Sequence, residues 1–188
     1  MHDLIAITPL GAHVARQDRV GAVTLAEAPA WALASVAARL GQEDACRAAL
    51  TTLLGVALPG PGGAASGAVF GAFWTGPDQW MIEAHYEGHE DLAGEVKAGL
   101  GDAASVSDQS DGWCRFDLTG VGLTAVLERL CNIDLGAMGA GSARRTAIEH
   151  MGCFVVCRTA GLHVSVIGAR SSAGSLHHAI LTAMRAAL

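Results

Sequence analysis

The stretch that decides the fold class is CFVVCRTAGLHVSVIGARSSAGSLHHAILTAM, residues 153–184. Two apolar runs, 153–157 and 162–167, flank a glycine turn, and this pattern predicts a β-hairpin. A serine at 171 or 172 then begins a helix. The apolar residues of that helix follow a helical spacing and are Leu176, Ile180, Met184 and Ala187. A hairpin that leads directly into an amphipathic helix favours an α+β fold.

The first half of the chain repeats this order. The runs 68–74 and 79–84 flank the turn Gly76-Pro77-Asp78 and predict a second hairpin. The residues after it, 90–100, have helical spacing at Leu92, Val96 and Leu100. Both halves therefore end on a hairpin followed by a helix.

A strand, a glycine and a helix precede each hairpin. The strand at 34–40 leads to a helix at 43–54, which Gly55 ends, and the strand at 113–118 leads to a helix at 120–131. We therefore predict one compact domain over 1–188 with an internal duplication. Its two tandem ferredoxin-like (split βαβ) units run at about 20–102 and 103–188. The remaining expectations are an arm at 1–18, a strand at 20–25, a loop at 60–67 and a hairpin through 108–112.

The composition of the chain narrows the classes of function. Of its 188 residues, 51% are hydrophobic and only 16% are charged, against about 25% charged residues in typical domains. This excludes intrinsic disorder and indicates that part of the surface meets another protein. The net charge of −6 argues against nucleic-acid binding.

Membrane insertion and secretion are not expected either. The uncharged stretch between Arg47 and Asp78 is broken by Pro59 and Pro61, so it does not suit a membrane-spanning helix. The first residues lack the basic region of a signal peptide. We expect a cytoplasmic protein.

The sequence offers no catalytic, cofactor-binding or metal-binding constellation. Its glycine-rich loops lack the P-loop and dinucleotide patterns, and no Gly-x-Ser-x-Gly nucleophile motif occurs. The histidines are scattered, so no metal site is expected. The five cysteines suit buried free thiols. A reactive thiol at Cys114, Cys131 or Cys153 is the enzymatic alternative.

Three arginines are candidates for contact with a partner or an anion. Arg144 and Arg145 follow the second glycine-rich loop, and Arg170 ends a strand. Their guanidinium groups could hold a carboxylate or a phosphate. They equally suit the rim of a protein interface, where arginine is enriched, and we favour the interface.

The tryptophans are the second set of candidates. The chain has four tryptophans and one tyrosine, which indicates large apolar faces that need cover. Trp80 and Trp113 are therefore predicted partner contacts, with core burial as the alternative. Strand alternation places Phe73 and Trp74 on opposite faces, so that one of the two can meet a partner.

Several short motifs resemble the gamma subunit of heterotetrameric sarcosine oxidase. Residues 74–82, WTGPDQWMI, resemble that family's "l-G-P-D-E-W-L" signature, and residues 130–135, LCNIDL, resemble its "g-C-p-I-D-L" helix end. Further matches in the same order are VSDQSDG at 106–112 with FDLTG at 116–120, GSARRT at 141–146, and Arg170-Ser171. Together they cover residues 74–171.

The resemblance implies a fold and a role. The fold is expected to be similar to that of the folate-binding aminomethyltransferases. The complex oxidises sarcosine to glycine, and tetrahydrofolate is the co-substrate that takes the one-carbon unit. FAD, FMN and NAD are carried by other subunits, so this chain is expected to bind no cofactor. It would be a non-catalytic subunit beside the alpha, beta and delta subunits, with self-association when isolated.

One alternative keeps the fold and changes the role. The chain would then be a free-standing module for a folate-like ligand, related to the aminomethyltransferases. Arg144, Arg145 or Arg170 would meet the glutamate tail of that ligand.

Overall fold

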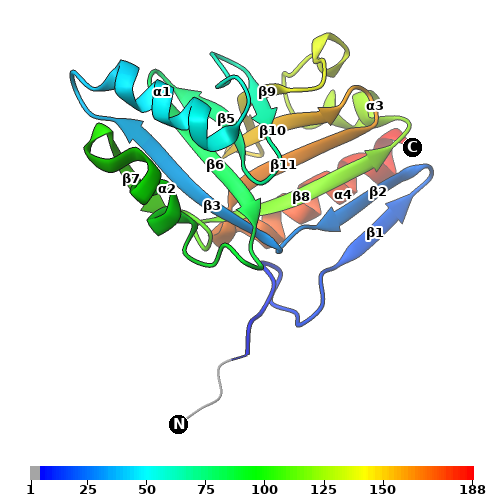
Figure 1. Cartoon of the computed structure of the whole chain (residues 1–188). Helices are drawn as coiled ribbons and strands as arrows, with labels where there is room; N and C mark the ends of the chain where they lie inside the picture. Colours follow the sequence, from blue (N-terminus) through cyan, green and yellow to red (C-terminus); the bar gives the residue numbers. More distant parts are fainter. Residues whose placement is uncertain (1–4) are drawn as a thin grey trace. The chain divides into compact units, whose positions relative to one another are not determined.

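The computed structural model describes residues 5–188, and Figure 1 shows their arrangement along the chain. The chain divides into two compact units. Unit 1 takes in Met1–Pro29, Gly112–Ala140 and Arg144–Leu188, of which residues 1–4 lie outside the described residues. Unit 2 takes in Ala30–Asp111 and Gly141–Ala143. Each unit is built around one antiparallel sheet, so the predicted α+β class is confirmed.

Unit 2 contains a five-stranded sheet in the order β4-β5-β6-β3-β7. Helices α1 and α2 contact each other, and their buried faces pack with alternate strand residues in one core. Cys46 and Leu50 of α1 meet Val96 of α2 in that core. The elements are β3 (Trp31–Ala38), α1 (Glu43–Leu54), β4 (Ala64–Ser66), β5 (Gly71–Gly76), β6 (Gln79–His85), α2 (Leu92–Leu100), the 3-10 turn Gly101–Ala103 and β7 (Ala104–Asp108).

Unit 1 is built on a six-stranded sheet in the order β1-β2-β8-β11-β10-β9. Leu176 and Ile180 of α4 pack in one core with Phe116 of β8 and Val166 of β11. The elements are β1 (Gln17–Val20), β2 (Val23–Glu27), β8 (Trp113–Gly120), α3 (Leu123–Leu127), the 3-10 turn Leu135–Ala137, β9 (Ser142–Ile148), β10 (Met151–Thr159), β11 (His163–Ala169), the 3-10 turn Arg170–Ser172 and α4 (Ala173–Ala187).

Elements with strong local signals lie where the sequence predicts them. Helix α1 runs from Glu43 to Leu54, and Gly55 ends it with φ of +67°, a left-handed conformation that glycine adopts without strain. The predicted hairpins are β5–β6 and β10–β11, each paired antiparallel. The strand predicted at 34–40 is strand β3, which begins earlier, at Trp31, and ends at Ala38, so that Leu40 lies beyond it and is exposed.

Two predicted strands pair differently from the expectation. The segment 20–25 is not one strand: it takes in Val20 at the end of β1, a turn at 21–22 and the first three residues of β2, because Gly21 takes φ of +56° and reverses the chain. The prediction of a hairpin through 108–112 is also wrong. Strand β7 pairs with β3, and β8 pairs with β2 and β11, so the chain leaves one sheet and enters the other at this turn.

Two further expectations need correction. The helix at 120–131 is only the short α3, because Gly120 still pairs with Val23 in the sheet and Gly122 has φ of +108°. The loop at 60–67 contains the short strand β4.

The compact units do not follow the limits expected for the duplication. Strand β2 belongs to unit 1 and β7 to unit 2, so neither 20–102 nor 103–188 coincides with a unit. The duplication and its ferredoxin-like detail stay predictions.

Candidate functional site

Unit 2 contains a groove with a volume of about 560 Å³. Helix α1 supplies Arg47 and Thr51 to its wall. All five residues of the loop 57–61, which contains two prolines, line it, and the β5–β6 hairpin adds Trp74 and Pro77. The volume falls within the range of ligand and anchor-residue pockets in proteins.

Trp80 fixes two walls of this groove to each other. Its side chain is 4% exposed, and its indole Nε1 donates a hydrogen bond to the carbonyl oxygen of Pro59 at 2.9 Å. The bond ties the proline loop to strand β6. Since Trp80 is a core residue, a partner can contact little of its ring.

The adjacent residues Phe73 and Trp74 divide between the two faces of strand β5, as alternation predicts. Phe73 is fully buried, whereas Trp74 is only partly buried and lines the groove. Trp74 is therefore the member of this pair that remains accessible.

An ion-pair chain borders the same groove. Arg47 contacts Asp44 at 2.9 Å and also pairs with Asp78, which lies in the β5–β6 turn. Asp78 has φ of +53°, a left-handed conformation that aspartate tolerates better than most residues. The Arg47 guanidinium thus links helix α1 to the hairpin turn.

Unit 1 holds a buried polar network that the sequence analysis missed. Arg115 and Asp117 form a two-pronged ion pair, with Nε–Oδ1 at 2.8 Å and Nη2–Oδ2 at 3.0 Å. The Ser165 hydroxyl donates to Asp117 Oδ1 at 2.6 Å and accepts from Arg158 Nε at 2.9 Å. The alternation of Arg115, Phe116 and Asp117 in one predicted strand is the signal that could have identified it.

This network does not form a nucleophilic triad. Burial alone would raise the pKa of Asp117, but the hydrogen bonds and charge of Arg115, together with Ser165 and His163, outweigh it and lower that pKa. The Ser165 hydroxyl donates to the carboxylate and accepts from Arg158, whereas the serine of a Ser-His-Asp triad donates to the histidine. The arrangement therefore stabilises a buried charge.

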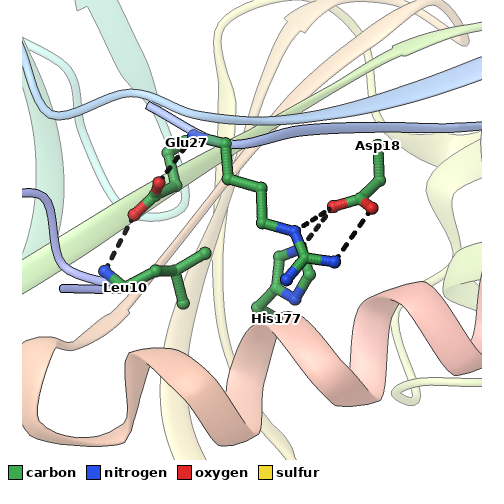
Figure 2. Close-up of polar contacts among 5 residues, drawn as sticks. Leu10, Asp18, Glu27 and His177 are labelled. Carbon is green, nitrogen blue, oxygen red and sulfur yellow. Dashed lines mark hydrogen bonds and ion pairs between the residues drawn. The ribbon is translucent and has the colours of Figure 1, made fainter. Parts of the chain in front are cut away.

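A second polar cluster anchors the N-terminal segment of unit 1 (Figure 2). The Glu27 carboxylate, 6% exposed, accepts the backbone N–H of Leu10 at 2.9 Å and that of Arg16 at 2.7 Å. Asp18 bonds the Arg16 guanidinium at 2.8 and 3.0 Å and lies 2.8 Å from Nε2 of His177 on α4. Chiefly through the hydrogen bond from Arg16, the pKa of Asp18 is lowered.

The predicted arginines do not form a single clamp. Arg144 and Arg145 both border a pocket of about 310 Å³. As consecutive residues of β9 their side chains leave opposite faces of the sheet, and Arg145 lies over the Phe154 ring at 5.8 Å. Arg170 donates to the carbonyl oxygen of Ile7 at 3.0 Å. Trp113 packs against the same Phe154 at a centroid distance of 5.5 Å.

The thiols argue against a cysteine nucleophile. Cys114 and Cys153 are buried, and burial raises the pKa of each to about 11. Cys131 is half-buried and donates to the carbonyl oxygen of Leu127 at 3.6 Å. Two of the three candidate thiols are thus protonated at neutral pH.

Two features are absent from residues 5–188. No group of three or more His, Cys, Asp or Glu side chains in this range is placed to hold a metal ion. Among the same residues no helix is long and apolar enough to cross a membrane.

The fold of the chain is also found in a solved structure. No family model and no curated protein matches the chain. Aminomethyltransferase T of the glycine cleavage system from Bartonella henselae superposes with a TM-score of 0.61 and 15% identity. The match covers 82% of this chain but only 44% of that protein, so the chain corresponds to less than half of it. The fold is thus one that aminomethyltransferases contain.

A second solved structure is more similar to the chain, both in fold and in sequence. The chain matches heterotetrameric sarcosine oxidase from Corynebacterium sp. U-96, in complex with pyrrole 2-carboxylate, with a TM-score of 0.73 and 25% identity. The match covers 86% of this chain and 83% of the chain in that structure. The resemblance to sarcosine oxidase predicted from the short motifs is confirmed.

Proposed function

We propose that this chain is a non-catalytic, gamma-type structural subunit of a sarcosine oxidase complex. The observation that carries the proposal is the likeness to a heterotetrameric sarcosine oxidase over 86% of this chain and 83% of the matched chain. Because the match covers most of both chains, the likeness is not confined to a shared subdomain. This supports the same position for the chain in a similar complex.

The geometry of the chain agrees with a role in assembly. The buried Ser165 engages a carboxylate, and the Cys114 and Cys153 thiols have pKa values raised to about 11. These observations support a role for the three side chains in folding rather than in chemistry. We assign FAD, FMN and NAD to the alpha and beta subunits, with tetrahydrofolate as co-substrate, and place the complex, including its delta subunit, in the cytoplasm.

A native pull-down from the source cells tests this function. The chain carries an affinity tag, and the eluate is examined by gel, by visible absorbance and for sarcosine-dependent peroxide. A yellow eluate that contains further subunits and oxidises sarcosine is the expected result. A colourless eluate that holds this chain alone, from cells that express sarcosine oxidase subunits, contradicts the proposal.

That contradicting result leads to the folate-like module. Calorimetry of the isolated chain with tetrahydrofolate then distinguishes the two roles. Heat of binding would favour the module, and its absence beside a positive folate-binding control would exclude it.

A further inference from the structure

The charge of the chain is divided very unevenly between its two units. Unit 2 carries eleven Asp and Glu residues against three Arg and Lys residues, a net charge of −8. The whole chain has a net charge of −6, so the rest of it carries +2. Unit 2 therefore attracts a basic partner surface at long range, whereas unit 1 does not.

Ion pairs engage two of the three cations of unit 2. Arg39 lies 3.4 Å from Asp102, and Arg47 pairs with both Asp44 and Asp78. At the rim of the groove two carboxylates therefore share one guanidinium. The Asp44 side chain is fully exposed, so its charge is available to a third group from outside.

Most of the residues that line the groove are apolar. The loop 57–61 and Pro77 form its walls, and the partly buried ring of Trp74 is exposed to it. Rigid apolar pockets that contain a tryptophan are typical of the centres of protein interfaces, with charges confined to the rim. The hydrogen bond from Trp80 to the Pro59 carbonyl fixes the proline loop before a partner binds. Docking would therefore cost little conformational entropy in the groove.

We propose that the groove between α1, the loop 57–61 and the β5–β6 hairpin docks a segment of a partner subunit that combines apolar side chains with Lys or Arg. The inference rests on the proposed function, since it presumes that the chain assembles with other subunits. Apolar side chains of the segment fill the groove, and its cations meet Asp44 and Asp78.

Two neighbouring threonines of α1 provide a matched test. Thr51 lines the groove and Thr52 does not. Both are exposed, and each hydroxyl donates to the backbone carbonyl one turn earlier, Thr51 to Arg47 at 2.8 Å and Thr52 to Ala48 at 3.1 Å. The substitutions Thr51→Arg and Thr52→Arg are thus chemically identical and point about 100° apart around the helix.

The experiment uses the full chain in its native complex. Tagged wild type, Thr51→Arg and Thr52→Arg are purified from source cells, and the flavoprotein subunits captured per tagged chain are measured by flavin absorbance. We expect Thr51→Arg to lose at least tenfold of the captured flavoprotein, because a bulky cation in the groove excludes and repels a basic segment. Thr52→Arg should capture as much as wild type. Circular dichroism and thermal unfolding confirm that both variants fold.

The other outcomes are distinct from one another. Equal capture by both variants overturns the groove as the docking surface and leaves the proposed function intact. Equal loss by both variants also overturns it, because the effect is then not specific to the groove. If wild type captures no flavoprotein, the proposed function fails and this inference falls with it.

A photo-crosslink identifies what occupies the groove. Benzoylphenylalanine at position 51 is irradiated in the intact complex, and the attached peptide is sequenced. The expected peptide comes from another subunit and contains Lys or Arg beside apolar residues. An acidic peptide, or one from a second copy of this chain, refutes the inference.

Discussion

The buried carboxylate of Glu27 is the group whose removal tests the structure most directly. It accepts two backbone N–H groups, from Leu10 and Arg16, at 2.9 and 2.7 Å, and so holds the N-terminal segment on strand β2. Glu27→Ala removes both acceptors. Hydrogen bonds to a charged group contribute about 1.5–3 kcal/mol each. Water can reach part of this site, so we expect a local loss of roughly 2–4 kcal/mol.

Hydrogen exchange of the two amides measures this loss at the place where it occurs. Since about 1.4 kcal/mol corresponds to a tenfold change, exchange at Leu10 and Arg16 should accelerate by about 30-fold or more. Glu27→Gln keeps one oxygen acceptor and should give a smaller acceleration. Glu87→Ala, at an exposed glutamate of unit 2, is the control and should leave both amides unchanged.

One result would refute this reasoning. If both amides keep their protection within twofold in Glu27→Ala, the carboxylate does not hold the segment. Faster exchange throughout the core of unit 1 would instead show that Glu27 stabilises the whole unit.

Three further predictions follow from acid–base chemistry and packing. The pKa of Asp18 is lowered in the folded chain, so its carboxylate contributes to the free energy of unfolding above the ordinary carboxyl pKa, and this contribution is lost as the pH falls below that value. The substitution Asp18→Asn should therefore flatten the acid side of the stability profile, measured by urea unfolding. A Cβ at Gly67 would lie 2.0 Å from the Leu54 carbonyl oxygen, so Gly67→Ala should destabilise unit 2 by roughly 2–4 kcal/mol. Its control is Gly99→Ala, in helix α2 with the nearest neighbour at 3.6 Å, which should be neutral or stabilise by up to about 1 kcal/mol; thermal unfolding measures both variants. With a pKa of about 11, Cys114 and Cys153 should react with a thiol reagent at pH 8 far more slowly in the native chain than in urea.

Each of these predictions has a clear contrary result. Parallel acid profiles for wild type and Asp18→Asn would mean that this carboxylate has the same pKa in the folded and unfolded chain. Equal melting temperatures for Gly67→Ala and Gly99→Ala would contradict the close approach at Gly67. Rapid native labelling at Cys114 would reopen the cysteine nucleophile.

Unit 2 illustrates what short-range sequence patterns can specify. The limits of α1 at Glu43 and Leu54 follow from helical spacing and from a glycine whose left-handed conformation ends the helix. The β5–β6 hairpin follows from its turn, Gly76-Pro77-Asp78. Both signals lie within a dozen residues, so neighbouring side chains determine them.

The candidate site was only partly predictable, for a similar reason. The alternation of Phe73 and Trp74 correctly indicated that one of them stays accessible. Nothing local indicated that Trp80 is a core residue, because its partner, the Pro59 carbonyl, lies 21 residues away. The separation of Arg144 from Arg145 was predictable, because consecutive residues of one strand point to opposite faces of the sheet.

The sequence by itself determined the α+β class, the helix α1, the β5–β6 and β10–β11 hairpins, and the resemblance to sarcosine oxidase. Only the tertiary structure decided which strands share a sheet. It joined β2 to β8 in one sheet and β7 to β3 in the other, and it limited α3 because Gly120 pairs with Val23. These pairings depend on backbone groups far apart in the chain, where each N–H and C=O bonds the strand that packing brings beside it. Local propensity is the same for either partner, so it cannot select between them.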